Sequence, residues 1–142
     1  MLLIDANLLV YAYHTQSAEH RASRQWLEST LNGAEPVRLA WMTIWAFLRI
    51  TTNARVFRRP LSAAEAGEAV SSWLDQPNVS VLEPAERHWE ILRDLARKGQ
   101  ASGPLMMDAA LAALAVEHGA TLCTADRDFA RFPGLKWTNP LG

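Results

Sequence analysis

The sequence opens with Met1-Leu-Leu-Ile-Asp-Ala-Asn-Leu-Leu-Val-Tyr11, and this stretch decides the fold. Residues 2–4 form a short apolar run without polar alternation, which is typical of a strand buried on both faces of a parallel sheet. Asp5 follows this run directly. Because the carboxyl ends of such strands open into the crevice where α/β sheets bind ligands, Asp5 is a candidate functional residue. The alternative is that Asp5 or Asn7 only caps the helix that follows.

Short apolar runs alternate with helical patterns along the rest of the chain. We expect strands near residues 36–41, 79–82, 120–126 and 135–138, and helices over residues 14–32, 43–53, 62–75, 84–98 and 105–118. This alternation predicts an α/β fold in which helices flank a parallel sheet. The sequence contains no convincing linker or repeat, so we expect a single domain over residues 1–142.

The composition is that of an ordinary globular domain, with 49% hydrophobic and 20% charged residues. No apolar run approaches the length needed to cross a bilayer, and the start lacks the basic residues of a signal peptide. We therefore expect a cytoplasmic protein without membrane association. The single cysteine, Cys123, lies in an apolar run, where a buried inert thiol is expected.

Arginines are unevenly distributed, although the net charge of −1 argues against a uniformly basic molecule. Residues 36–64 contain no Asp or Glu. The same stretch contains five arginines: Arg38, Arg49, Arg55, Arg58 and Arg59. Arginine binds phosphate in a bidentate manner, so this region predicts a local anionic partner. For the last three, a solvated loop is an equally good explanation.

Asp108 is the most informative single residue. It is the one acid in the helical run 105–116, which is otherwise apolar on every face, and such a helix is expected to be buried. Burying an unpaired carboxylate is costly, so Asp108 must be neutral, paired with a cation or bound to a metal. The structural alternative is that Asp108 only stabilises the dipole at the start of its helix.

Asp126 repeats the arrangement of Asp5, because it also follows a short apolar run. If the two strands are neighbours, Asp5 and Asp126 meet at their ends, and the helix of Asp108 leads directly into the second strand. Three converging carboxylates would repel one another unless a divalent cation neutralised them. Oxygen ligands favour Mg²⁺ or Mn²⁺, which would activate water for attack on a phosphodiester. For Asp126 and for Asp128, a cap of the turn at Phe129 is the alternative, and for Asp128 we favour it.

Four segments from both ends and the middle of the chain form a recognisable set. They are Ile4-Asp-Ala-Asn7, Trp45-Ala-Phe-Leu-Arg49 with Thr52-Asn-Ala-Arg-Val-Phe57, Met107-Asp-Ala-Ala-Leu-Ala-Ala-Leu-Ala115, and Thr124-Ala-Asp-Arg-Asp-Phe129 with Phe132-Pro-Gly-Leu135. In this order they resemble the PIN-domain ribonucleases, in particular the VapC toxins of type II toxin–antitoxin systems. The resemblance implies a three-layer α/β/α sandwich with a central parallel sheet and a Mg²⁺-dependent endoribonuclease. It also implies a homodimer, an RNA substrate of the tRNA or rRNA class, and a cognate VapB-like antitoxin that blocks the active site.

Carried over residue by residue, the resemblance implies that Asp5 and Asp108 bind the metal and that Asp126 is a further active-site acid. Asn7 and Thr124 match positions that hold water or orient the carboxylates.

One position departs from the family pattern. PIN nucleases usually carry Glu at the start of a Glu-x-x-Arg pattern, which here reads Ala46-Phe-Leu-Arg49. Compensation by Asp128, a metal that keeps one more water, and weak activity are all open. For Arg49 itself, the simple explanation is a salt bridge with one of the acids.

Two other functions remain as alternatives. Phosphoryl-transfer folds of the receiver or haloacid-dehalogenase type also place Asp at strand ends around Mg²⁺, but they need an Asp-x-Asp pair or a lysine late in the sheet. Here the pair reads Asp5-Ala-Asn7, and the two lysines, Lys98 and Lys136, are not expected at strand ends. The other alternative is a degenerate PIN fold that binds RNA or a protein partner without cutting, which Ala46 makes credible.

Six tryptophans are many for a chain of 142 residues. Trp26, Trp73 and Trp89 fall on the apolar stripes of expected helices, so we predict that they are buried. Trp41 and Trp45 are harder to bury, and we predict a dimer or antitoxin surface for them.

Overall fold

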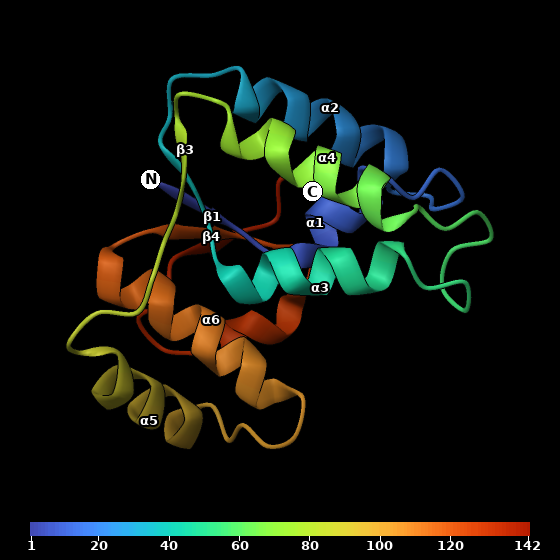
Figure 1. Ribbon diagram of the computed structural model, residues 1–142. Coiled ribbons are helices and arrows are strands. Elements are labelled where there is room, and N and C mark those ends of the chain that lie inside the picture. The colour runs from blue at the N-terminus through green and yellow to red at the C-terminus, as the bar shows by residue number, and fades with distance from the viewer.

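The computed structural model describes residues 1–142 as a five-stranded sheet flanked by helices (Figure 1). In chain order the elements are β1 (Leu2–Ile4), α1 (Ala6–Tyr11), α2 (His20–Leu31), β2 (Val37–Leu39), α3 (Trp41–Thr51), α4 (Ala63–Leu74), β3 (Val79–Val81), α5 (His88–Lys98), α6 (Leu105–His118), β4 (Thr121–Cys123), the 3₁₀-helix η1 (Arg127–Arg131) and β5 (Trp137–Thr138). The predicted α/β class is confirmed. None of the helices combines the length and the apolar character that are needed to cross a membrane.

All strand pairs in the sheet are parallel, and the strand order is β3-β2-β1-β4-β5. The opening strand β1 therefore lies at the centre. Leu2 pairs with Val37 of β2 on one side, and Ile4 pairs with Cys123 of β4 on the other. The prediction that the two strands ending in acids are neighbours is confirmed, because β1 and β4 lie side by side in register.

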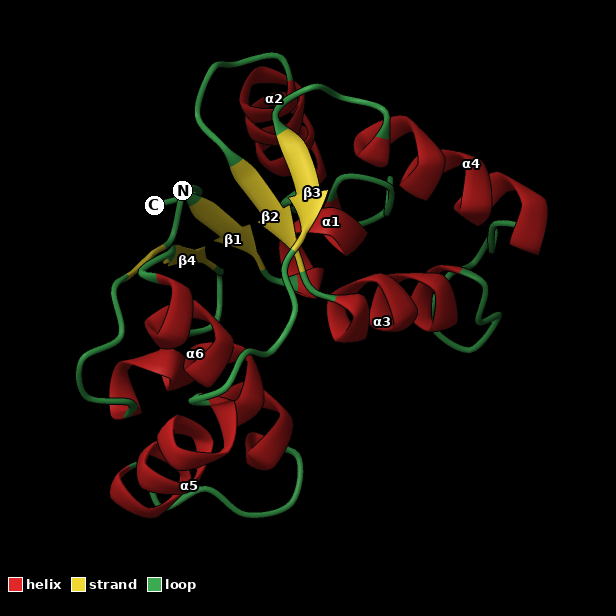
Figure 2. Cartoon of the chain, turned by 60° about the vertical axis from the view of Figure 1, so that its left-hand side comes forward, coloured by secondary structure: helices red, strands yellow, loops and turns green.

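The sheet separates two apolar cores. Leu3 and Ile4 are both completely buried, but they point into different cores, which explains the lack of polar alternation in β1. Helices α1 to α4 lie on one side of the sheet (Figure 1), where Ile4 packs with Phe47 and Trp73. Helix α6 lies on the other side, and α5 packs outside it (Figure 2). This is the expected three-layer arrangement.

Two helices, α2 and α5, begin later than the sequence pattern predicts. Helix α2 begins at His20 rather than at residue 14, because residues 14–17 form a turn in which Ser17 N donates to His14 O. Helix α5 begins at His88 rather than at residue 84. The Glu117 carboxylate accepts from the backbone N–H groups of Ala85 and Arg87 and fixes the preceding segment outside the helix.

Helix α3 begins at Trp41, two residues earlier than the sequence pattern predicts. Thr43 lies inside the helix and is 2% exposed. A capping box begins α4, since Ser62 Oγ accepts from Glu65 N and Glu65 Oε1 accepts from Ser62 N.

Trp89 is 66% exposed, so its predicted burial is wrong, whereas Trp73 is buried as predicted. Helix α5 is an outer helix whose main contact is α6, so only a narrow stripe around Ile91 and Leu95 is covered. Trp89 lies off this stripe. Trp41 and Trp45 are exposed, in line with the surface position that the sequence predicts for them.

Candidate active site

The carboxyl ends of β1 and β4 bring Asp5 and Thr124 together. Because Ile4 pairs with Cys123, the next residue of each strand lies opposite the other, and Asp5 N donates to Cys123 O at 2.9 Å. Thr124 Oγ1 donates to Asp5 Oδ2 at 2.8 Å, and Ala6 N donates to Asp5 Oδ1 at 2.7 Å. Asp5 is thus the N-cap of α1, as the structural alternative predicts, and at the same time it is held rigidly at the mouth of the sheet.

Asn7, Thr124 and Asp126 continue this hydrogen-bond network. Asn7 Nδ2 donates to Thr124 Oγ1 at 3.2 Å, and Ala125 N donates to Asn7 Oδ1 at 3.4 Å. Asp126 N donates to the same Thr124 hydroxyl at 3.0 Å. Thr124 is completely buried, so its hydroxyl fixes the relative positions of the two strand ends.

Asp126 also caps η1, because its Oδ1 accepts from Asp128 N at 2.9 Å. The capping alternative therefore applies to Asp126. Asp128 is exposed and lies in the first turn of η1 rather than at its cap.

Asp108 approaches from the first turn of α6, and it lines the same cavity as Asp5. This cavity has a volume of about 530 Å³. Its lining residues come from the end of β1 and from α1, α3 and α6: Asp5, Ala6, Met42, Thr43, Trp45, Ala46, Arg49, Met107, Asp108 and Leu111. We call it the acidic cleft. Two carboxylates that are 103 positions apart in sequence therefore face one space.

The expectation that the helix of Asp108 is buried on all sides is wrong for its first turn. Ala109 and residues 111–115 are buried, but Met106 is 39% and Met107 58% exposed. The first turn extends past the sheet to form one wall of the acidic cleft, which leaves these two side chains accessible.

Both carboxylates of the cleft have raised pKa values. Burial raises the pKa of Asp5, and the nearby Asp126 adds to this, while the hydrogen bonds from Thr124 and Ala6 act in the opposite direction. Burial, followed by the charges of Asp5, Asp126 and Asp128, raises the pKa of Asp108 to about 6. The negative charge of the site therefore disfavours a further negative charge on Asp108.

Ala46 and Arg49 face the two carboxylates across the acidic cleft. Ala46 thus occupies the position from which the usual glutamate of PIN nucleases would reach the cleft. Arg49 is exposed and takes part in none of the ion pairs of the structure, so the simple explanation of a salt bridge with one of the acids does not apply.

The predicted site residues gather in one region, but not around a single point. Asp5, Asp108 and Arg49 line the acidic cleft, whereas Asp126 lies next to Asp5 through Thr124. No group of three or more His, Cys, Asp or Glu side chains is close enough to hold a metal ion by protein ligands alone. Two carboxylates in an open cleft do fit Mg²⁺, which typically binds one or two protein carboxylates and keeps several waters.

The sequence motifs did not assign four residues of this region to the site: Met42, Trp45, Met107 and Arg131. The first three line the cleft, and the charge of Arg131 lowers the pKa of Asp108. The exposure of Trp45 follows from its spacing on α3, where Ile44 and Phe47 mark the buried face. Nothing in the sequence indicates that the 3₁₀-helix brings Arg131 close to Asp108.

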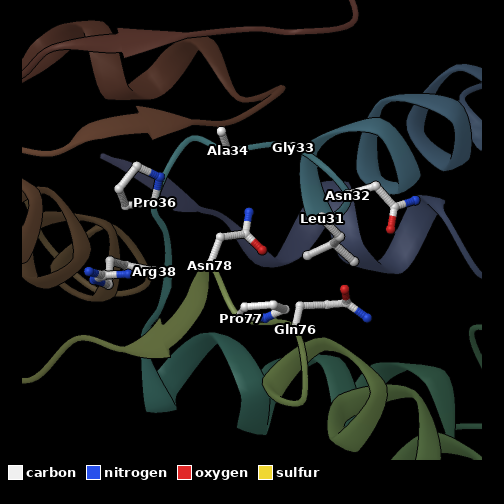
Figure 3. Close-up of a pocket in the computed structure, with 9 residues that line it drawn as sticks. All are labelled: Leu31, Asn32, Gly33, Ala34, Pro36, Arg38, Gln76, Pro77 and Asn78. Atoms are coloured by element: carbon white, nitrogen blue, oxygen red, sulfur yellow. The ribbon is translucent and has the colours of Figure 1, made fainter.

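A second cavity of about 530 Å³ lies at the opposite end of β2 and β3. Figure 3 shows that loop residues between α2 and β2, together with Gln76, Pro77 and Asn78, line it. Arg38 is its one charged residue, and Arg38 Nη1 donates to Val37 O at 3.0 Å. Because this cavity contains no acid, it lacks the chemistry of the acidic cleft.

Comparisons with known proteins agree with this geometry. The PIN domain family model matches residues 2–135. Ribonuclease VapC43 of Mycobacterium tuberculosis is 44% identical over 141 residues, covering 99% of this chain and 96% of that protein. Ribonuclease VapC37 of the same organism is 41% identical over 140 residues, covering 99% and 97%.

Among solved structures, VapBC-1 from nontypeable Haemophilus influenzae superposes with a TM-score of 0.69 at 18% identity, covering 99% of this chain and 98% of that one. A toxin–antitoxin complex from Klebsiella pneumoniae gives 0.65 at 19% identity, with coverages of 99% and 98%. At these identities the likeness concerns the fold.

Proposed function

This chain belongs to the PIN-domain family and, within it, to the VapC ribonuclease toxins, and we propose that it cleaves RNA in the acidic cleft with a divalent metal held by Asp5 and Asp108. The observation that carries this proposal is the common cleft, which the first strand and the sixth helix reach from distant parts of the chain. Two carboxylates with raised pKa values in one cleft are typical of a site that binds a cation.

The metal in this proposal is Mg²⁺, or Mn²⁺ in its place. When bound, such an ion supplies an activated water and stabilises the charge that develops on the phosphodiester. Asp5 is fixed for this role by two hydrogen bonds, from Thr124 and Ala6, which hold both of its oxygens. Asp126 and Asn7 support the same arrangement through Thr124, so we assign them positioning roles.

We also propose an antitoxin of the VapB type as partner, and a homodimer as the assembly. Support for the antitoxin comes from the solved structures with the same fold, which include VapBC-1 and a toxin–antitoxin complex. The homodimer is what the family resemblance implies. The RNA substrate belongs in this proposal to the tRNA or rRNA class that the family resemblance implies.

The test is cleavage of RNA by the purified chain with Mg²⁺ or Mn²⁺, scored by sequencing new 5′ ends in total RNA. Asp5→Asn and Asp108→Asn should each lower the rate by about 100-fold or more, because each removes a charged metal ligand. The matched control is Asp75→Asn, at an exposed acid that ends α4 and forms no ion pair. It should cleave as the wild type does.

Cleavage that persists in excess chelator would contradict the metal site. A wild type that binds RNA but cuts none would support the degenerate alternative, which Ala46 specifically favours, because the cleft contains two acids where the family usually has an additional glutamate.

A further inference from the structure

Trp45 is the largest exposed side chain of the acidic cleft. It is 63% exposed, although an indole ring is normally among the better buried side chains. Arg49 lies one helical turn later on α3, so the two side chains project from the same face of the helix, and both line the cleft with Asp5 and Asp108. An aromatic ring, a guanidinium and two carboxylates therefore share one space.

The surroundings of Arg49 attract anions. Residues 49–64 contain four arginines and no acid, and none of these arginines takes part in an ion pair. Arg55, Arg58 and Arg59 are exposed in the segment that follows α3. The C-terminal end of α3 is thus a basic surface next to an acidic cleft, which suits a polyanion whose backbone must reach a cation bound by the acids.

We propose that Trp45 stacks on an unpaired RNA base and that Arg49 binds a phosphate beside it, so that the two residues together hold the strand in the acidic cleft. This inference rests on the proposed function, because the bound strand is the RNA that Asp5 and Asp108 would cut. Bases in a duplex have their faces covered by neighbouring pairs, whereas an unpaired base offers a free face to an indole ring. The residue pair therefore selects single-stranded or looped RNA.

A protein partner is the competing occupant of this surface, because a further cavity of about 330 Å³, more apolar than the acidic cleft, adjoins the cleft. Trp45 borders both cavities, whereas Trp41 borders only the apolar one. Arg49 and the two acids line the cleft and not the apolar cavity. Arg49 can bind an RNA phosphate, and the two acids can bind the metal beside that phosphate. We therefore assign Trp45 to RNA rather than to a protein partner.

The first experiment measures binding of a short fluorescein-labelled single-stranded RNA by anisotropy, in the Asp5→Asn background so that the RNA stays intact. Trp45→Ala should weaken binding by about 5- to 150-fold, the usual loss when one base–aromatic stack is removed. Trp45→Phe should restore most of the affinity, since it keeps a ring. Trp41→Ala is the matched control, an exposed tryptophan of the same helix outside the cleft, and should leave the affinity unchanged.

Two further readouts separate stacking and phosphate binding from a merely structural effect. An RNA that lacks the base at the stacked position should bind the wild type more weakly than the intact RNA does. Trp45→Ala should bind both RNAs equally, because it has no ring on which the base could stack. Arg49→Met should reduce the slope of log affinity against log salt by about 0.7, the value for one phosphate contact on a single strand. Circular dichroism checks that each variant is folded.

Equal binding of RNA by Trp45→Ala and the wild type would overturn the inference, and so would equal loss with Trp41→Ala. A Trp45→Ala variant that keeps RNA binding but loses self-association would assign the residue to a protein interface instead. If the wild type cuts RNA and Trp45→Ala cuts it equally well, only this inference fails. If the wild type cuts no RNA, the proposed function fails, and the binding data still decide the role of Trp45.

Discussion

Asp108 is a residue on which burial and three neighbouring negative charges act together. Its pKa is raised to about 6 by burial and by the carboxylates of Asp5, Asp126 and Asp128, with partial relief from Arg131. The neutral form is therefore favoured below about pH 6. At neutral pH the charged form is repelled by the neighbouring carboxylates, and a bound cation would relieve this repulsion. This is the physical basis for assigning a metal to the cleft.

The raised pKa makes the stability of the metal-free protein depend on pH. In the unfolded chain Asp108 titrates near its ordinary value of 3.8, so between about pH 4 and pH 6 the folded state binds more protons. The contribution of Asp108 to stability must therefore fall as pH rises through this window. Asp108→Asn should remove this fall and stabilise the chelated protein at pH 7 by about 1 kcal/mol, after allowance for solvent screening at this partly exposed carboxyl. Thermal unfolding in chelator at pH 4 and pH 7 measures the effect.

The same measurement on Asp75→Asn provides the control, and its pH dependence should equal that of the wild type. A difference between Asp108→Asn and the wild type that is as large at pH 4 as at pH 7 would show that the effect is not electrostatic.

Ala46 stands where PIN nucleases usually carry a glutamate, so the cleft has two carboxylates and lacks the usual additional one. Because Ala46 faces Asp5 and Asp108, Ala46→Glu should add an oxygen ligand. We expect the variant to bind Mn²⁺ on the order of ten times more tightly, and to be less stable than the wild type in chelator because a third negative charge is added. Isothermal titration calorimetry measures the affinity.

Ala46→Gln is the matched control, because it has the same length without the charge and should not tighten binding to the same extent. If Ala46→Glu leaves the Mn²⁺ affinity unchanged, the ion does not lie within reach of residue 46. The proposed placement between Asp5 and Asp108 would then be wrong.

At the scale of elements, Gly99 ends α5 for a reason of packing. Its φ of −84° suits any residue, but a Cβ at this position would lie 2.7 Å from Phe132 Cε1 and 3.0 Å from Leu95 O. Phe132 is buried directly after η1, so α5 and η1 pack tightly at this point.

Gly99→Ala should therefore destabilise the protein by about 1–3 kcal/mol, the usual cost of overpacking a core. Gly67 provides the contrast, because it lies inside α4 and a Cβ there meets nothing within 4 Å. Gly67→Ala should stabilise the protein by about 0.5–1 kcal/mol, since alanine loses less conformational entropy in a helix. Urea denaturation of the two variants measures both effects, and equal effects of one sign would contradict this account.

The sequence predicts the elements of the fold well where the signal is local. The end of α6 at Gly119 follows from its left-handed conformation, with φ of 67°, and the start of α4 follows from its capping box. Helix α5 was harder to predict, because the backbone donors before it are satisfied by Glu117, 30 or more residues away along the chain. No local pattern contains that contact, and the same holds for the exposure of Trp89.

The candidate site was predictable in part, for the same reason. An acid directly after an apolar run indicates the mouth of a parallel sheet, which correctly placed Asp5 and Asp126 near each other. That Arg49 forms no ion pair could not be predicted, because helical spacing gives the face of a side chain but not its distance from acids on other elements.

At the scale of the whole molecule, the two apolar cores share the central strand, and the acidic cleft lies where β1 leaves the sheet. We infer that residues 1–142 act as one domain, because Leu3 and Ile4 belong to different cores and link them through one strand. A cation that bridges Asp5 and Asp108 would connect β1 with α6 and hence the two sides of the sheet. Metal binding should therefore stabilise the entire fold rather than one loop.

Mg²⁺ or Mn²⁺ at about 100 times its dissociation constant should add about 2.7 kcal/mol to the free energy of unfolding and raise the Tm by roughly 5–10 °C at neutral pH. Near pH 5, about nine tenths of Asp108 is protonated for a pKa of about 6, so the apparent affinity should fall about tenfold and the Tm shift should shrink. Asp5→Asn should lose most of the shift, whereas Asp75→Asn should keep it. An equal shift in Asp5→Asn would mean that the cation stabilises the molecule from another place, because an ion without contact to β1 cannot connect the two cores through the cleft.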